Sequence, residues 1–335
     1  LNAMFSLGMK DVFHDYRLIG GMRLHGNLRG ADYFLSYENL KRRLDKKLTF
    51  FRIGQTRDYS QTLVGQESTH EIRYTTTYPF SKVFSWQGEV FGRRDNIVYK
   101  STENNSLQRE NNTQNWLGGR TQLTFDNSLN LGMNLWSGSK LAIYGEVFRE
   151  IDLQLDQNTE NRTFYVVGAD MRHSIRLINK MIWANRVAGA MSLGGARVAY
   201  FLGGVDNWLF PSFNNNIQVE NSDDYQYKTL GTNLRGFTQN IRNGSAYAAW
   251  NSELRIPLFK MFAQSPIRSN FLNNFLVVGF TDWGTAWTGL NPFNEENTLS
   301  SREIRDGNLT ITVRTLSSPV VGGYGFGFRS TILGY

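Results

Sequence analysis

The stretch AYAAWNSELRI, residues 246–256, decides the fold. Its alternate positions divide into a small or apolar set and a largely polar set: Ala246, Ala248, Trp250, Ser252, Leu254 and Ile256 against Tyr247, Ala249, Asn251, Glu253 and Arg255. Successive side chains of a β-strand point to opposite faces of its sheet. The stretch therefore predicts a strand whose first face can meet lipid and whose second face needs water or polar partners.

The same period of two recurs along the chain and predicts fourteen strands. Their expected spans are 2–10, 17–25, 30–37, 47–57, 66–78, 82–93, 115–126, 139–151, 162–175, 180–192, 196–203, 246–257, 273–286 and 321–334. A soluble β-sandwich would also alternate, but its strands are typically about 5–6 residues long. Long strands in this number favour an all-β fold, a transmembrane antiparallel β-barrel, over the sandwich. No Pro/Ser-rich linker divides residues 1–335, so they are expected to form a single outer-membrane barrel domain.

The composition agrees with a barrel that encloses a polar interior. Aromatic residues make up 14% of the chain and glycines number 32, yet the mean hydropathy is −0.40. No window approaches the roughly 18 consecutive apolar residues of a transmembrane helix. The net charge of +7 raises the possibility of nucleic-acid binding. Because Lys and Arg are scattered, apart from one cluster at residues 41–47, anionic lipid headgroups are the expected partner and nucleic acid is not.

An ordered set of short motifs adds a family resemblance. Leu234-Arg235-Gly236-Phe237 lies in an expected long loop, 204–245, and it is followed by Glu253 in the stretch quoted above and by Asp282 in Phe280-Thr281-Asp282-Trp283-Gly284. This order resembles the BamA-like family of outer-membrane assembly and translocation barrels, the bacterial surface antigen barrels. The signature of that family is an aliphatic-Arg-Gly-aromatic tetrapeptide, here the LRGF motif, on a loop that folds back into the lumen. The chain looks most similar to members fused to a periplasmic β-propeller-like region.

The resemblance also implies a strand count. Family members have sixteen strands, with the motif loop between strands eleven and twelve, where the count of strands above also places it. The chain departs from the family by an insertion between Gly204 and Leu234 and by its end at Tyr335, before strands fifteen and sixteen. We therefore expect about fourteen strands of sixteen here, with a complete fourteen-strand barrel as the alternative. A segment preceding Leu1 is also expected, because no signal peptide is visible there.

The function that the resemblance implies is assembly or transport at the bacterial outer membrane. Such a barrel assists the insertion of other outer-membrane proteins, or translocates polypeptide or lipid. Its expected partners are outer-membrane lipid and lipopolysaccharide, client outer-membrane or secreted proteins, and periplasmic or lipoprotein partners. A passive pore or a structural subunit of a larger envelope complex is the alternative. No enzyme activity and no cofactor are expected.

Arg235 is the residue on which this interpretation can be tested physically. A guanidinium stays charged and carries five hydrogen-bond donors, so inside a barrel it needs carboxylate partners. Glu253 and Asp282 fall on the inward parity of two neighbouring strands, and we expect Asp282 to be the closer partner. Gly236 is expected to allow a tight turn and Phe237 to anchor the loop. A solvated surface loop is the alternative for the whole motif.

Other residues give weaker signals. The histidines His14, His25, His70 and His173 are isolated in the sequence, without the spacing of a metal site. Four tryptophans fall on the outward parity and are expected on the lipid face near its rims: Trp86, Trp183, Trp250 and Trp283. No catalytic residue or metal site is therefore proposed from the sequence.

Overall fold

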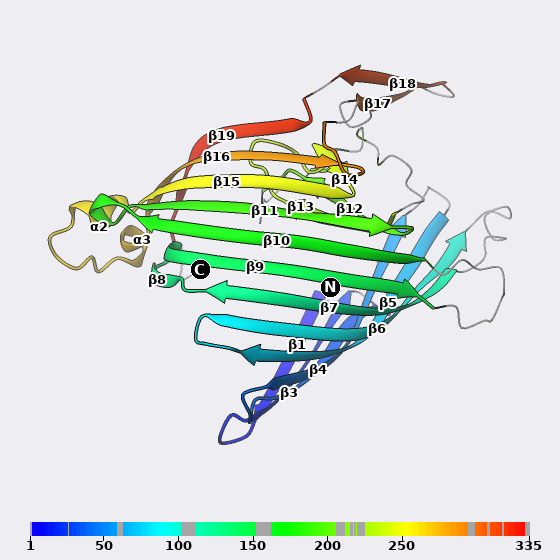
Figure 1. Cartoon of the computed structure of the whole chain (residues 1–335), viewed down its shortest axis with the longest axis horizontal. Helices are drawn as coiled ribbons and strands as arrows, with labels where there is room; N and C mark the ends of the chain where they lie inside the picture. The colour runs from blue at the N-terminus through cyan, green and yellow to red at the C-terminus, as the bar shows by residue number, and fades with distance from the viewer. Residues whose placement is uncertain are drawn as a thin grey trace. The chain divides into compact units, whose positions relative to one another are not determined.

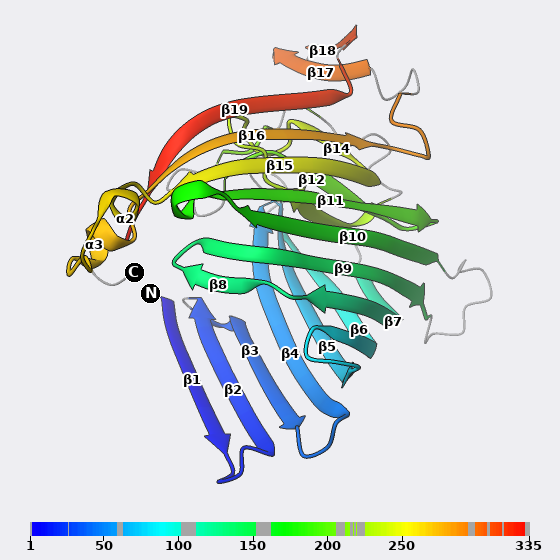
Figure 2. The ribbon, with the colours of Figure 1, turned by 60° about the vertical axis from the view of Figure 1, so that its left-hand side comes forward.

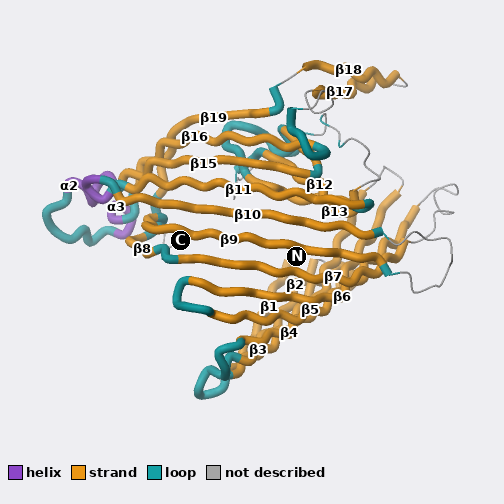
Figure 3. Tube along the Cα trace, viewed as in Figure 1, coloured by secondary structure: helices purple, strands orange, loops and turns teal. Residues whose placement is uncertain are grey.

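The structure, a computed structural model, describes residues 2–25, 27–58, 63–101, 112–151, 162–205, 212–214, 217, 219, 225–293, 299–306, 309–316 and 318–331. Strands dominate these residues (Figure 3). The long strands are β1 (Asn2–Lys10), β2 (Tyr16–His25), β3 (Asn27–Asn39), β4 (Asp45–Asp58), β5 (Leu63–Pro79), β6 (Phe84–Ser101), β7 (Asn112–Asp126), β9 (Leu135–Glu150), β10 (Thr163–Arg176), β11 (Ile182–Gly194), β15 (Ala246–Ile256), β16 (Leu276–Trp287) and β19 (Val320–Arg329). The expected end at Tyr335 lies outside the described residues.

These strands belong to one 14-stranded sheet, which confirms the predicted fold class. Its order is β1-β2-β3-β4-β5-β6-β7-β9-β10-β11-β15-β16-β19, with the short β8 (Leu129–Gly132) paired to β9 off this path. Neighbouring strands such as β1 with β2 and β15 with β16 run antiparallel. The strands are long, as membrane crossing requires, up to 18 residues in β6.

The predicted span 196–203 is wrong as a strand of this sheet. The segment forms β12 (Arg197–Leu202), which lies in a separate three-stranded sheet of order β13-β12-β14 with β13 (Tyr225–Thr232) and β14 (Arg242–Gly244). Two stretches between the predicted strands also contain strands: 204–245 includes β13 and β14, and 287–320 includes the hairpin of β17 (Leu299–Asp306) and β18 (Leu309–Leu316). Because β12 is not part of the large sheet, the motif loop follows the tenth long strand of the sheet order and not the eleventh.

The chain divides into two compact units. Unit 1 comprises Leu1–Leu123 and Gly145–Phe164, and unit 2 comprises Thr124–Tyr144 and Tyr165–Tyr335. Figures 1 and 2 show the strands of both units in two orientations. The motif residues, their predicted partners and the cavity beside them all belong to unit 2.

One face of unit 1 carries charges that neutralise each other across strands. Glu71 on β5 is 2% exposed and Glu89 on β6 is 9% exposed, and Arg73 binds both, at 2.6 and 3.0 Å. Arg120 on β7 binds Glu146 on β9 at 2.6 Å. Charged hydrogen bonds of this kind allow carboxylates to be buried on a sheet face.

Aromatic rings fill the same face of unit 1 between these charges. Phe91 stacks edge-on against Phe148, whose ring lies parallel to that of Phe164 with centroids 4.5 Å apart. The Phe91 ring also covers Gly118 so closely that no side chain could replace the glycine hydrogen. A glycine in a strand interior often marks such a close approach.

The three-stranded sheet packs within unit 2, against β11, β15 and β16. β12 is buried along almost its whole length, and Ala199, Phe201 and Tyr225 form its apolar core. This small sheet holds both ends of the motif loop, because β13 precedes Leu234 and β14 follows Phe237.

In unit 2, the face of the large sheet that points away from the small three-stranded sheet carries exposed aromatic rings. Trp183, Trp250 and Trp283 are 43%, 42% and 47% exposed, on the face away from Glu253 and Asp282. Within the described ranges, no helix is long and apolar enough to span a membrane.

Candidate functional site

The motif loop begins where two glycines turn the chain out of β12. Gly203 and Gly204 have φ of +115° and +80°, values that L side chains rarely adopt. Gly204 forms an antiparallel bridge with Leu234, and its N–H donates to the carbonyl of Phe237 at 2.9 Å. Gly236 has φ +91° and provides the turn at the tip. The four motif residues are therefore closed into one compact loop by main-chain hydrogen bonds.

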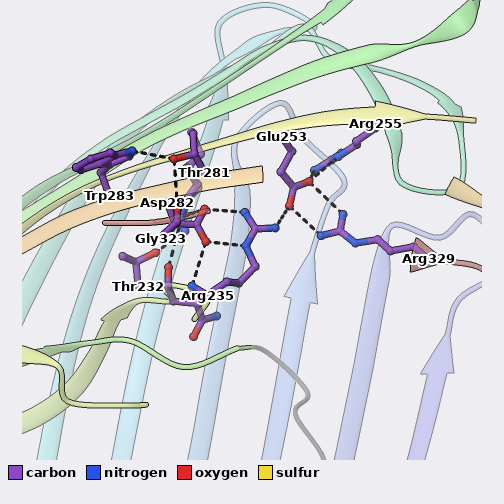
Figure 4. A network of polar contacts seen from close by, with 12 residues as sticks. Thr232, Arg235, Glu253, Arg255, Thr281, Asp282, Trp283, Gly323 and Arg329 are labelled. Carbon is purple, nitrogen blue, oxygen red and sulfur yellow. Dashed lines mark hydrogen bonds and ion pairs between the residues drawn. The ribbon is translucent and has the colours of Figure 1, made fainter. Parts of the chain in front are cut away.

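Arg235 extends from this loop onto two carboxylates of the wall (Figure 4). Its Nε donates to Asp282 Oδ2 at 2.6 Å and its Nη2 to Asp282 Oδ1 at 2.6 Å, a bidentate pair. Its backbone N–H donates to the same Oδ2 at 3.0 Å. Its Nη1 donates to Glu253 Oε1. Three residues that the sequence singled out are thus brought together at one place.

Asp282 is held by the wall as well as by the loop. It is 0% exposed and lies opposite Asn251 in the register of β15 and β16. The Asn251 amide donates to Asp282 Oδ1 at 2.9 Å. Within the described part of the chain, Arg235 is its only cationic partner.

Glu253 is shared by three guanidinium groups. Besides Arg235 it accepts hydrogen bonds from Arg255 Nε at 2.8 Å and from Arg329 Nη2 at 2.8 Å. Arg255 lies two residues along β15, and Arg329 comes from β19, two strands away in the sheet order. Glu253 therefore ties the loop, β15 and β19 into one charged network.

The guanidinium of Arg235 is also enclosed by nonpolar groups. Its Cζ lies 3.9 Å from the ring centroid of Phe280, within the range of a cation–π contact. Burial alone would lower the pKa of Arg235, but the hydrogen bonds with Asp282 and the charges of Glu253 and Asp282 outweigh it and raise this pKa. The group stays a cation whenever the loop is docked.

Two glycines of the wall make room for the loop. At Gly323 on β19, a Cβ would lie 2.7 Å from the carbonyl oxygen of Arg235 and 3.4 Å from the ring of Phe237. At Gly284 on β16, a Cβ would lie 2.9 Å from the side chain of Leu234, which is fully buried. The motif loop thus packs closely against β16 and β19 at two positions where glycine, which has no side chain, leaves room for it.

The sequence reasoning identified Leu234, Arg235, Gly236, Phe237, Glu253 and Asp282, and missed the residues around them. The missed residues are Asn251, Arg255, Phe280, Gly284, Gly323 and Arg329. Strand parity could have found Asn251 and Arg255, since both share a face with Glu253. Nothing local marks Arg329, because its contact with Glu253 joins positions 76 apart.

A cavity of about 720 Å³ adjoins the network in unit 2. Its wall includes Lys140, Arg172 and Arg186 besides the network residues Arg235, Glu253 and Asp282. Many of its charges are paired, since Arg172 and Arg186 both bind Asp170. Among the described side chains, no group of three His, Cys, Asp or Glu could hold a metal ion.

Comparison with known proteins places the fold. No family model matches the chain, and no curated protein matches its sequence. Among solved structures, BamA from Haemophilus ducreyi lacking POTRA domains 1–3 is similar to this chain, with a TM-score of 0.50 and 13% identity over 97% of this chain and 70% of that one. The 14-stranded sheet therefore has the fold of a BamA-type barrel.

Two further structures share weaker similarity. CdiB from Escherichia coli has a TM-score of 0.48 at 11% identity and covers 97% of this chain and 58% of its own. CdiB from Acinetobacter baumannii has a TM-score of 0.44 at 11% identity and covers 98% of this chain and 56% of its own.

Proposed function

We propose that the chain is a bacterial outer-membrane barrel that assists assembly of outer-membrane proteins or translocates polypeptide or lipid, and that the docked motif loop is required for this activity. The BamA-type fold supports the membrane setting, with outer-membrane lipid around the barrel and client outer-membrane or secreted proteins as substrates. The alternative function, a passive pore or a structural subunit, uses the same fold.

The observation that carries the proposal is the contact of Arg235 with Asp282 and Glu253. A passive pore does not need a loop held in one position. Here Leu234 packs against Gly284, and Arg235 and Phe237 pack against Gly323, so the wall fits the docked loop closely. Removing one partner of a buried ion pair typically costs about 3–5 kcal/mol, because the other charge is left without compensation. The loop therefore has a defined docked state, and its release is a step that an activity could use.

Depletion of the protein, followed by complementation, tests the proposal. Wild-type chain should restore the levels of many outer-membrane proteins or of the translocated substrate, whereas Arg235→Ala should insert normally and restore them poorly. Arg255→Gln is the matched control, since it also removes one guanidinium from Glu253 but leaves the loop bound to Asp282. Unchanged levels after depletion would favour the passive pore or structural subunit. Full activity of Arg235→Ala would show that the docked loop is not needed.

A further inference from the structure

A second, smaller pocket lies in unit 2, away from the loop. It has a volume of about 300 Å³ and is lined by Arg176, Lys180, Lys260, Leu131, Leu135 and Ile182. Three cations and three aliphatic side chains thus surround one space. Leu135 and Ile182 belong to a buried apolar cluster, so the aliphatic side of the pocket is continuous with the core of the unit.

The pocket is built by three stretches of the chain at one end of the strands, and the first of them carries Leu131 of β8 and Leu135 of β9. Arg176 ends β10, Lys180 belongs to the 3-10 turn η1 (Ile178–Lys180), and Ile182 begins β11. Lys260 comes from the short helix α2 (Leu258–Phe262). β8, α2 and the helix α3 (Asn270–Asn273) lie together at this end of unit 2 (Figure 2). Barrels of this class usually carry their shorter connections on the periplasmic side.

The three cations lack a compensating acid. In the part of the chain that the structure describes, none of them forms an ion pair with a carboxylate, and no Asp or Glu lines the pocket. The Nζ of Lys180 donates a hydrogen bond to the backbone carbonyl of Lys260 at 3.2 Å. Like charges facing one space repel each other, so an anion bound there is favoured electrostatically.

Lys180 lies in the tight turn that joins β10 to β11. Asn179 and Lys180 have φ of +55° and +67°, the two positive values of a type I′ hairpin turn, and the N–H of Met181 closes this turn by donating to the carbonyl of Ile178 at 3.2 Å. On the other side, the Nζ of Lys260 lies 3.3 Å from the position of a Cβ at Gly132, so this glycine leaves space for the ammonium. Both lysines are therefore positioned by the fold at the pocket.

The surroundings of the pocket distinguish a lipid from a soluble anion. The two segments that supply the lysines each carry a large exposed apolar side chain, Ile178 in η1 at 78% and Phe262 in α2 at 72% exposure. In α2, Phe259 lies against Phe275, whose ring stacks on Phe328 of β19. Cations beside exposed apolar side chains at the end of membrane-spanning strands match the boundary between headgroups and acyl chains.

We propose that this pocket binds the phosphate of an anionic glycerophospholipid, with its acyl chains lying over Ile178 and Phe262. Arg176, Lys180 and Lys260 would contact the phosphate diester, and the aliphatic side would contact the glycerol. The site is independent of the motif loop and is not required by the proposed function.

Native mass spectrometry of the whole chain in detergent, with phosphatidylglycerol added, tests this proposal. The wild type should retain one phosphatidylglycerol in preference to phosphatidylcholine. Each basic residue near an anionic headgroup contributes a factor of roughly 5, so replacing Arg176, Lys180 and Lys260 by Gln should weaken retention on the order of 100-fold. The matched control replaces Lys10, Lys82 and Arg94 by Gln, three exposed cations of unit 1 outside the basic cluster at residues 41–47.

Three results would overturn the proposal. Equal loss of phosphatidylglycerol in both triple variants would mean that only net charge matters. Equal retention of phosphatidylcholine by the wild type would exclude recognition of the anion. Displacement of the lipid by a similar concentration of inorganic phosphate would assign the site to free phosphate. The single variant Lys260→Gln, on a half-buried position of a short helix, repeats the measurement if the triple variant fails to fold.

Discussion

Gly323 offers the sharpest test of the seat beneath the motif loop. In Gly323→Ala the new Cβ would lie 2.7 Å from the carbonyl oxygen of Arg235, whereas ordinary contact begins at 3.4 Å. The loop or the strand must retreat by about 0.7 Å, the difference between these two distances. A shift of this size would stretch the 3.0 Å hydrogen bond from the Arg235 N–H to Asp282 beyond a useful length.

Overpacking of this kind typically costs about 1–3 kcal/mol. If the cost falls on docking, the ratio of docked to released loop drops roughly 5- to 150-fold. Limited proteolysis of the inserted protein measures this ratio, because cleavage between residues 204 and 245 follows the released population when opening is fast relative to cleavage. The nicking rate of Gly323→Ala should rise by the same factor.

Gly327→Ala is the matched control for this experiment. It places the same substitution on the same strand and the same face, at a position where a Cβ meets nothing within 4 Å. Its nicking rate should equal that of the wild type. Equal rates for the two variants, both correctly inserted, would refute the reasoning that β19 is shaped to seat the loop.

Three further predictions concern stability. Phe91→Ala should lower the free energy of unfolding by about 3–5 kcal/mol in urea titrations in vesicles, because it empties the space over Gly118; a loss below about 1 kcal/mol would mean that the cluster collapses around the gap. Asn240 is 1% exposed, has φ +66°, and its side chain donates to two backbone carbonyls at 2.7 and 2.8 Å. Asn240→Ala should lower the free energy of unfolding by about 1 kcal/mol more than Asn240→Gly, because both variants lose the hydrogen bonds but only alanine is strained at this φ. An equal loss in the two variants would contradict this. Adding Asp282→Asn to Arg235→Ala should recover part of the stability lost in the single variant, and a purely additive result would show that the two side chains are not coupled.

The strands with one polar and one apolar face were predictable from the sequence. Alternation depends only on side-chain type, so it located β15 within one residue and both ends of β1 without error. β12 could not be assigned in this way, since RVAYFL contains the continuous apolar run 198–202 and is buried on both faces. A run of this kind indicates a buried strand but not the sheet to which it belongs.

The site was predictable only in part for a related reason. Parity places Glu253 and Asp282 on one face, and the resemblance suggested that Arg235 meets them. Parity gives no information about which strands become neighbours, so the link from β19 through Arg329 was not visible. The close contacts at Gly284 and Gly323 were not predictable either, because a glycine in a strand can mark a bulge, a bend or a close approach, and only the tertiary structure shows which.

The two carboxylates under Arg235 contribute unequally to holding the loop. If the loop left, Glu253 would keep Arg255 and Arg329, whose bonds to it at 2.8 Å come from the wall. Among the described side chains, Asp282 would keep the amide of Asn251 and no cation, and it is completely buried while the loop is docked. A buried carboxylate without a cation is costly, so release of the loop requires water or another cation to reach Asp282. Asp282 therefore sets the stability of the docked state, while Glu253 connects that state to the position of β19.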